Sequence, residues 1–326
     1  MSLSPADIGH RVVVRRRLTT DSTERPRFSD LLGVLVRLDA ENRLVVVETV
    51  AGIEVSVPVG EIAAAKRIPP KRDIPDLELE RIAALGWQGL ETERLGGWLL
   101  RAGGGWTGRA NSVLPLGGPG LPLDAALDHV SAWYTARHLP PTVQLPLPAR
   151  EDLRAALAER GWTDRWGALV LTAGVAALRA KGLAVAGLPP VTVAVEPGPD
   201  WLGAYHYRGG PLPPVAPAVL RAAATPAFAA VEEAGKPIAI CRLSVDEGWV
   251  GITAVEVAPG HRRRGLATHL LAGALDWASE SGARSAYLQV DSDNTAALAL
   301  YQKAGFKVHH TYRYYRPGRR PSQNRL

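Results

Sequence analysis

The stretch from Val255 to Phe306 constrains the fold more than any other part of the chain. It opens with alternating apolar residues that end at Val257, which is typical of a strand, and then passes through a short basic loop. Apolar residues recur at three- and four-residue spacing from 266 to 278, which predicts an amphipathic helix. We expect Gly282 to end that helix, so the stretch begins as strand, loop and helix.

The loop between this strand and this helix has the composition of an anion site. Arg262, Arg263 and Arg264 stand immediately before Gly265. The first N–H groups of a helix have no partner inside it, and the helix dipole favours negative charge there. Because Gly265 and Ala267 carry little or no side chain, a phosphate can approach the backbone closely. The loop therefore predicts a phosphate or pyrophosphate site.

A second strand and a second helix complete the stretch. Ala286 to Val290 is a short apolar run typical of a strand. Asp293-Asn294 is a candidate N-cap for a helix over Thr295 to Ala304, and Gly305 is expected to end that helix.

Three motifs in this order resemble the coenzyme A half of the GNAT superfamily of N-acetyltransferases. They are Val257-x-Pro259, Arg262-x-x-Gly265-x-Ala267, and Asn294-x-x-Ala297-x-x-Leu300-Tyr301-x-x-x-Gly305-Phe306. One R-x-x-G-x-A motif alone would be weak, but three motifs separated by the expected helix and strand are specific. The resemblance implies a mixed α/β fold and acetyl transfer from acetyl-CoA as cosubstrate, without a metal.

The resemblance also assigns roles to single residues. Val255 and Val257 would offer backbone groups to the pantetheine arm, and Asn294 matches a position that bonds the same arm. The pyrophosphate would be held by Arg262, Arg263, Arg264, Gly265, Leu266, Ala267 and Thr268. Tyr301 matches the residue that contacts the coenzyme and protonates the departing thiolate, a task within the reach of a phenol. The alternative is a helix tyrosine that packs its ring in the core.

A general base is also needed, because an alkyl amine is mostly protonated near neutral pH. Glu256, on the strand before the loop, is the first candidate. Strict alternation turns Glu256 away from the side of Val255 and Val257, so it reaches the site only if a bulge interrupts the strand. Glu232 and Glu233 are alternatives.

Composition limits what else the chain can be. Its 326 residues are enough for two or three domains, and 46% are hydrophobic, without the apolar run of about eighteen residues that a membrane span needs. The first thirty residues lack a signal-peptide core, so we expect a soluble, cytoplasmic protein without a membrane partner. The single cysteine, Cys241, excludes an internal disulfide and a multi-cysteine zinc site and is expected to be a buried thiol.

The net charge of +6 is unevenly distributed. Five arginines and no acid occur from Arg313 to Arg325. We interpret them as a solvated tail and as arginines gathered for the phosphates of coenzyme A. A nucleic-acid contact is less favoured, because acids and bases are mixed elsewhere in the chain.

Residues 1 to 72 are expected to form a small SH3-like β-barrel. Four short strands are predicted, over 9–17, 31–38, 44–50 and 53–59. Arg15, Arg16 and Arg17 are interpreted as exposed charges of an edge strand. Ile68 to Arg72, with two consecutive prolines, is expected to be a linker. This resemblance fixes no function for the barrel.

Residues 73 to 180 repeat the element order of the C-terminal stretch. The predicted elements are helices over 77–84, 123–137 and 150–160 and extended segments over 97–102, 109–116, 142–147 and 168–172. Leu153 to Trp162, LRAALAERGW, aligns with Ala297 to Phe306, ALALYQKAGF. We infer an internal duplication whose first copy is a degenerate GNAT-like unit.

The first copy lacks the residues of the chemistry. Gly117 to Leu123 contains no arginine, and Leu157 stands where Tyr301 stands. Its Gly104 to Ser112 segment is nevertheless dense in polar and aromatic groups. That segment is either a wall of the acceptor site or a hairpin in which Arg109 and Asn111 satisfy local backbone groups.

A linker over 174–190 is expected to precede the final domain, residues 188 to 318. Two helices, 200–207 and 215–224, and three antiparallel strands, 228–233, 238–245 and 249–257, are predicted there, with hairpin turns at Gly235 and Gly248. Trp201, Tyr205 and Tyr207 either line the acceptor pocket or belong to the core.

The predicted function is transfer of an acetyl group from acetyl-CoA to a primary amine of a small molecule or protein. One alternative is a mycothiol-synthase-like acetyltransferase. The other is a protein that binds nucleic acid through its barrel and basic tail and senses acetyl-CoA. The sequence does not identify the acceptor, the general base, the role of the barrel or the oligomeric state.

Overall fold

A computed structural model describes residues 3–18, 27–49, 53–67, 74–207 and 209–318. The chain divides into two compact units: residues 1–74 together with 176–180, and residues 75–175 together with 181–326. The predicted linker over Ile68 to Arg72 lies outside the described residues, and so do Arg319, Arg320 and Arg325 of the basic tail.

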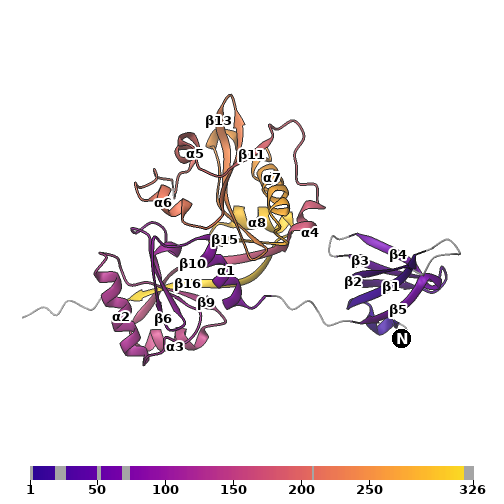
Figure 1. The fold of residues 1–326 in the computed structure, drawn as a ribbon, viewed down its shortest axis with the longest axis horizontal. Coiled ribbons are helices and arrows are strands. Elements are labelled where there is room, and N and C mark those ends of the chain that lie inside the picture. The colour runs from indigo at the N-terminus through magenta and orange to yellow at the C-terminus, as the bar shows by residue number, and fades with distance from the viewer. Residues whose placement is uncertain (1–2, 19–26, 50–52, 68–73, 208, 319–326) are drawn as a thin grey trace, which may run out of the picture. The chain divides into compact units, whose positions relative to one another are not determined.

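The first unit is built on one antiparallel sheet of five strands (Figure 1), in the spatial order β4-β3-β2-β1-β5. Its elements are η1 (Pro5–Asp7), β1 (Arg11–Leu18), β2 (Arg27–Asp39), β3 (Leu44–Thr49), β4 (Glu54–Pro58), η2 (Val59–Glu61) and β5 (Ile62–Arg67). Alternate valines such as Val12, Val14 and Val47 are buried with Leu35 in its core. The sheet is consistent with a small barrel-like domain.

The expectation that Arg15, Arg16 and Arg17 lie on an edge strand is wrong. β1 is an inner strand, because it pairs with β2 on one side and with β5 on the other. β5 was not predicted, because its sequence, IAAAKR, has Ile62 as its single β-branched residue and is otherwise rich in alanine, which is depleted in strands. Arg15 instead faces Asp30 on β2 at 2.7 Å.

The second unit contains a mixed sheet of eight strands in the order β11-β12-β13-β14-β15-β10-β16-β9 and a smaller sheet β6-β7-β8 (Figure 1). The strands are β6 (Glu91–Leu95), β7 (Trp98–Ala102), β8 (Leu114–Pro115), β9 (Val143–Leu147), β10 (Trp162–Gly174), β11 (Val191–Ala194), β12 (Pro226–Glu233), β13 (Lys236–Asp246), β14 (Trp249–Val257), β15 (Ser285–Asp291) and β16 (Lys307–Pro317). A parallel bridge between Val113 and Val143 connects the smaller sheet to β9.

Helices cover these strands. They are α1 (Asp76–Gly86), α2 (Leu123–Thr135), α3 (Glu151–Glu159), α4 (Val175–Arg179), α5 (Pro199–Ala204), α6 (Ala216–Arg221), α7 (Leu266–Glu280) and α8 (Thr295–Ala304), with short turns η3 (Arg109–Asn111) and η4 (Pro259–His261). α7 buries the predicted apolar stripe, including Leu270, Ala274 and Ala278. Within the described parts of the chain, no helix combines the length and the apolar character needed to cross a bilayer.

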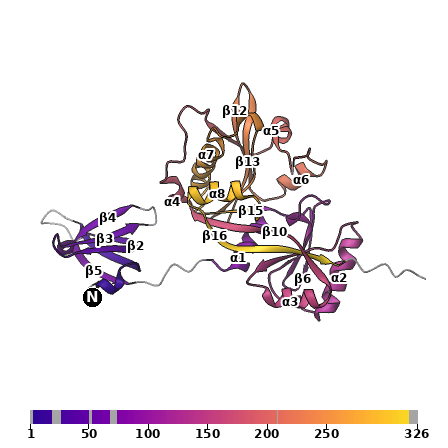
Figure 2. The ribbon, with the colours of Figure 1, turned by 180° about the vertical axis from the view of Figure 1, so that it is seen from behind.

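The four neighbouring strands β15-β10-β16-β9 of the second unit are arranged symmetrically about β10 and β16. We call residues 75–174 the first half and residues 188–318 the second half. β9 and β15 occupy equivalent places on either side of the central pair. β10, the last strand of the first half, pairs with β15 of the second half, and β16, the last strand of the second half, pairs with β9 of the first half. The halves therefore exchange their final strands, and Figure 2 shows β16 running beside β10 between them.

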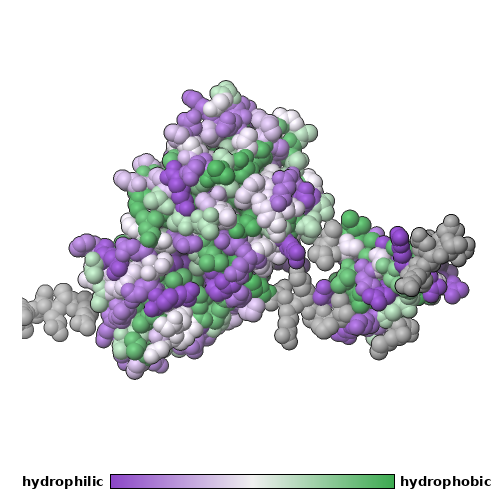
Figure 3. Space-filling view, in the orientation of Figure 1, coloured by the Kyte–Doolittle hydropathy of each residue, from purple (hydrophilic) through white to green (hydrophobic). Residues whose placement is uncertain are grey.

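Several element predictions need correction. The expected linker over 174–190 contains α4, and residues 109–116 form η3 and only the two-residue β8. β6 was missed. The expected C-terminal tail begins with β16, in which Arg313 pairs with Asp164 at 2.8 Å and Arg316 donates to the Thr142 hydroxyl at 2.9 Å. These two arginines therefore link β16 to β10 and to the residue before β9. Figure 3 shows hydrophilic residues spread over both units on the face of Figure 1.

Candidate active site

A cleft of about 980 Å³ opens where β14 and β15 separate. These parallel strands pair only from Trp249 to Ile252 on β14, although β14 continues to Val257. Beyond the last pair both strands line the cleft, β14 with residues 254–257 and β15 with Gln289 and Asp291. Backbone N–H and C=O groups on this part of β14 have no neighbour on β15, so they are available to a ligand.

A β-bulge on β14 turns Glu256 into this cleft. Glu256 pairs with Ile240 on β13 and Thr253 pairs with Arg242, so two residues, Ala254 and Val255, oppose the single Cys241. Ala254 has a φ of +50°, which is unusual for a residue other than glycine. The bulge that the sequence analysis required for Glu256 is present. Val255, Glu256 and Val257 all line the cleft as a result.

The carboxylate of Glu256 is held by the loop after α5. It accepts the main-chain N–H of His206 at 2.6 Å, and its second oxygen lies 3.3 Å from His206 Nδ1. The side chain is 18% exposed, so it remains in contact with water at the cleft. Of the alternatives, Glu233 pairs with Arg264 at 3.0 Å and with His261 at 3.1 Å. Neither Glu232 nor Glu233 is among the described residues that line the cleft.

The loop before α7 follows the predicted pattern only in part. Arg263 and Gly265 both have positive φ, +66° and +81°. Gly265 is the N-cap residue of α7, and no side chain of the described residues caps that helix start. The loop residues that line the cleft are Arg262, Arg263, Gly265, Leu266, Ala267 and Thr268. The prediction for Arg264 is corrected, because its side chain turns to Glu233 and does not line the cleft.

α8 brings Asn294 and Tyr301 to the same cleft. Asn294 is the N-cap of α8, as predicted, and its Oδ1 accepts the N–H of Ala297 at 3.1 Å. Only the amide nitrogen of Asn294 is then available as a donor to a ligand. Tyr301 is 8% exposed, and its ring packs edge-on against Phe306 with centroids 5.9 Å apart.

Burial sets the protonation of two groups beside this site. Burial raises the pKa of the Tyr301 phenol well above its ordinary value, with a smaller contribution from Cys241. Tyr301 is therefore protonated at neutral pH and can donate a hydrogen bond. Burial raises the pKa of the Cys241 thiol to about 12, so Cys241 is a thiol rather than a nucleophilic thiolate. The expectation of a buried thiol is confirmed.

Comparison with known proteins decides the family. Residues 75–315, most of the chain, match the family model described as "Probable histone acetyltransferase Rv0428c C-terminal". The Mycobacterium tuberculosis protein named "Probable histone acetyltransferase Rv0428c" is 31% identical over 323 residues, which cover 94% of each chain.

The chain belongs to this family of GNAT acetyltransferases. GNAT enzymes are acyltransferases, and the homologues indicate acetyl transfer. "Uncharacterized N-acetyltransferase YobR" of Bacillus subtilis is 28% identical over 247 residues, covering 72% of this chain and 97% of that protein. Among solved structures, a GCN5-related N-acetyltransferase from Kribbella flavida shares the fold with a TM-score of 0.51. It is 18% identical and covers 74% of this chain and 96% of that one.

The far side of the cleft in this GNAT chain is aromatic and is built partly by the first half. Trp166 on β10 lines it together with Tyr312 and Tyr314 on β16. Tyr205 and Tyr207, in the segment after α5, line it as well, whereas Trp201 is buried in the core below. Trp166, Tyr312 and Tyr314 were not predicted, although the alternating aromatic residues of β16 are a readable signal.

The two interpretations left open for the segment 104–112 apply to different residues. Arg109 is a wall of the cleft: it donates to the side chain of Gln289, and its guanidinium carbon lies 4.6 Å from the centre of the Trp87 ring. Asn111 satisfies the local backbone, because it accepts N–H groups of Gly103 and Gly105 and donates to the carbonyl of Thr107.

Proposed function

We propose that the chain transfers the acetyl group of acetyl-CoA to a primary amine in the cleft between β14 and β15. The observation that carries this proposal is that three features line one cleft: the unpaired end of β14, the uncapped start of α7, and the hydroxyl-bearing Tyr301. Each of them suits a different part of the cosubstrate, namely the amides of the pantetheine arm, the pyrophosphate and the sulfur.

In this proposal the pyrophosphate binds at the start of α7. The residues of the first turn, Leu266 to Thr268, line the cleft and have N–H groups without a partner inside the helix, and Arg262 and Arg263 add positive charge. A side chain at position 265 would disturb the loop itself, because the backbone there is left-handed and a Cβ atom would lie 3.1 Å from Val185. Arginine variants are therefore a cleaner test of the loop than glycine variants.

The chemical steps follow from two side chains. Glu256 accepts a proton from the ammonium group of the acceptor, directly or through water, and the neutral amine then attacks the thioester carbonyl. The C–N bond forms, the C–S bond breaks, and the Tyr301 hydroxyl gives its proton to the departing sulfur, while the extra proton on the attacking nitrogen passes through water to the Tyr301 phenolate. The products are an acetylated amine and the free thiol of coenzyme A.

The acceptor side favours an amine attached to an apolar or aromatic body. Trp166, Tyr205 and Tyr314 offer ring surfaces in the same cleft as Glu256. The Mycobacterium tuberculosis relative is named as a probable histone acetyltransferase, so lysine side chains of basic proteins are the first acceptors to test. Small amines that carry an aromatic ring form the second group. The experiment is a screen of both groups that detects the released thiol; no thiol release above the rate without acceptor would contradict the proposal.

Arg263→Ala should weaken acetyl-CoA binding about tenfold or more, because an arginine at the cleft rim loses a charge-assisted contact with phosphate. Isothermal titration with acetyl-CoA measures the affinities of variant and parent. The difference between them should be smaller at high salt, because screening already weakens this contact in the parent.

Arg264→Ala is the matched control, because Arg264 is the next residue and has its guanidinium on Glu233 outside the cleft. Its affinity should stay within about threefold of the parent, as expected for loss of an exposed ion pair. Equal losses in the two variants would mean that the loop is held differently from what we describe.

We infer that the two halves are copies of one fold and predict one acetyl-CoA per chain. The loop before α2, at the place equivalent to the α7 loop, contains Gly117 and Pro122 but no arginine, and Pro122 precedes the first helical residue. Leu157, fully buried on α3, replaces the tyrosine. Titration should give a stoichiometry of about one, and two equivalents bound with similar affinity would contradict the assignment.

A further inference from the structure

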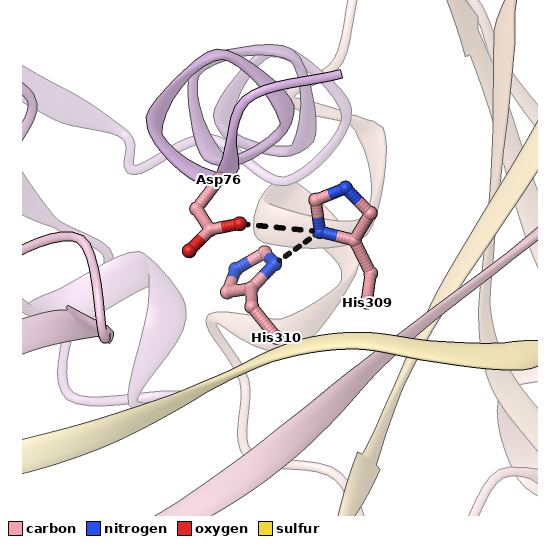
Figure 4. Close-up of side chains that lie close together, drawn as sticks. All are labelled: Asp76, His309 and His310. Atoms are coloured by element: carbon pink, nitrogen blue, oxygen red, sulfur yellow. Dashed lines mark hydrogen bonds and ion pairs between the residues drawn. The ribbon is translucent and has the colours of Figure 1, made fainter. Parts of the chain in front are cut away.

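Outside the cleft, a cluster of two histidines and an aspartate lies between α1 and β16. His309 Nδ1 is 2.9 Å from His310 Nδ1 and 3.5 Å from a carboxylate oxygen of Asp76. All three atoms lie within 4.8 Å of one another. Figure 4 shows the two imidazole rings and the carboxylate turned toward a common point. We propose that Asp76, His309 and His310 form a binding site for a divalent transition-metal ion of the Zn²⁺ type.

The spacing of the three atoms suits such an ion. Zn²⁺ binds histidine nitrogen and carboxylate oxygen at about 2.0 to 2.2 Å, so the ligand atoms of a tetrahedral site are about 3.4 Å apart. The distances of 2.9 and 3.5 Å lie close to that value on either side. Two imidazole nitrogens with one carboxylate oxygen are a ligand set that favours zinc, cobalt or nickel over magnesium or calcium.

A bulge in β16 brings both histidines to the same side. Consecutive strand residues ordinarily point to opposite faces. On β10, however, Val170 pairs with His310 and the next residue, Leu171, pairs with Val308, so His309 is an additional residue on β16. This bulge turns His309 toward Asp76 together with His310. The two rings therefore converge because of an irregularity in the strand.

A buried carboxylate fixes the tautomer of His310. His310 and Glu80 are 4% and 2% exposed, and Glu80 lies 3.0 Å from His310 Nε2. A carboxylate only accepts, so the shared proton is on Nε2 and the lone pair of Nδ1 faces the cluster. Glu80 also accepts from Gln144 at 2.8 Å, and Arg101 donates to Gln144 at 2.8 Å. A carboxylate behind a histidine is the usual support of a metal-binding imidazole.

The cluster also has a route to solvent. The side chain of Asp76 is 22% exposed and that of His309 is 8% exposed, whereas His310 is closed off. An ion can therefore enter past Asp76, and a water can complete a tetrahedral shell. The sequence analysis expected no metal; the single cysteine excludes a multi-cysteine zinc site but leaves histidine and carboxylate ligands open.

An ion at this place would join α1 to β16, which lie about 230 residues apart in sequence. A cross-link that closes so long a loop stabilises the folded chain mainly by restricting the unfolded one. The cluster lies two residues before Tyr312, which lines the cleft. The ion would therefore hold the start of the segment that carries the aromatic wall, so its proposed role is structural rather than catalytic.

The test uses the full chain, purified without a polyhistidine tag and stripped with a chelator. Zn²⁺ should bind with a stoichiometry of about one in isothermal titration. It should raise the melting temperature by roughly 5 to 10 °C at about one hundred times its dissociation constant. Co²⁺ should give the intense visible absorption of a tetrahedral site. Absence of both binding and a melting shift would overturn the proposal.

Variants separate this site from general binding by surface histidines. Asp76→Asn keeps the size of the side chain and should abolish the tetrahedral Co²⁺ spectrum. If Asp76→Asn does not fold, His309→Gln tests the same prediction and should also abolish the spectrum. Glu80→Gln should weaken Zn²⁺ binding roughly 10- to 100-fold. His129→Gln, which changes an exposed histidine paired with Glu93, should leave both readouts unchanged. Parent-like Zn²⁺ affinity in folded Asp76→Asn and His309→Gln would overturn the assignment.

Discussion

Tyr301→Phe should lower the rate of acetyl transfer by ~10² to 10⁴-fold while leaving acetyl-CoA affinity nearly unchanged. The hydroxyl interacts with the sulfur most strongly as the C–S bond breaks, so its loss affects the transition state more than the bound cosubstrate. The ring remains and keeps its contact with Phe306, so the substitution leaves no cavity beside α8. Thiol release with the best acceptor from the screen measures the rate.

Melting temperature and acetyl-CoA affinity of the same variant serve as controls. A tyrosine that only packs in the core would lose some stability and retain its turnover per folded molecule. A protein that only senses acetyl-CoA would have no turnover in the parent. Turnover within about threefold of the parent, at equal folded concentration, would remove Tyr301 from the mechanism, because a general acid contributes far more.

Glu256→Gln should reduce turnover by a similar ~10² to 10⁴-fold at neutral pH, and the loss should shrink at high pH. The carboxylate is needed to remove a proton from the ammonium form of the acceptor. As the pH approaches about 10.4, the ordinary pKa of a lysine amine, the neutral amine is supplied by the solution itself. Rates measured from pH 7 to 10 for parent and variant should therefore converge.

Glu233→Gln is the discriminating control for this prediction. Glu233 is the alternative base on the same sheet, but it pairs with Arg264 and His261 outside the cleft. Its turnover should remain within about twofold of the parent, since an exposed ion pair contributes little. A deficit that is the same at every pH in Glu256→Gln would instead indicate that Glu256 only positions His206 and the loop after α5.

Local signals were enough to predict α8 and its ends. Asn294 caps the helix through its side chain, and Gly305 ends it with a φ of +112°, which is a conformation that suits glycine. Both features depend on neighbours within four residues. The direction of the Glu256 side chain could be predicted only on the condition that a bulge is present. Strict alternation turns this side chain away from the cleft, and the bulge on β14 turns it toward the cleft.

Features that depend on distant residues were missed for the same physical reason. β5 acquires its strand character from its partner, and the pairing of β16 with the first half leaves no mark on local periodicity. Arg264 leaves the cleft because Glu233, 31 residues earlier, attracts its guanidinium. His309 and His310 become part of a candidate metal site only when α1 brings Asp76 next to them. The alternation of Tyr312 and Tyr314 can be read from the sequence. Their place beside Trp166 in the cleft cannot, because it depends on the pairing of β16 with β10.

The pairing of β10 with β15 and of β16 with β9 also has a consequence for folding during synthesis, because the sheet of the first half can be completed only after the second half has been made. β16 follows every other strand of its sheet in the sequence, so the strand that lies between β9 and β10 is synthesised after both of its neighbours. Until the second half is made, the first half has three unpaired strand edges, namely both edges of β10 and the edge of β9 that later pairs with β16. A chain released after α8 would contain the loop before α7 but would lack the strand between β9 and β10, so its sheet would be open there. Because β10 pairs with β15 and β16 pairs with β9, each half depends on the other to complete its sheet.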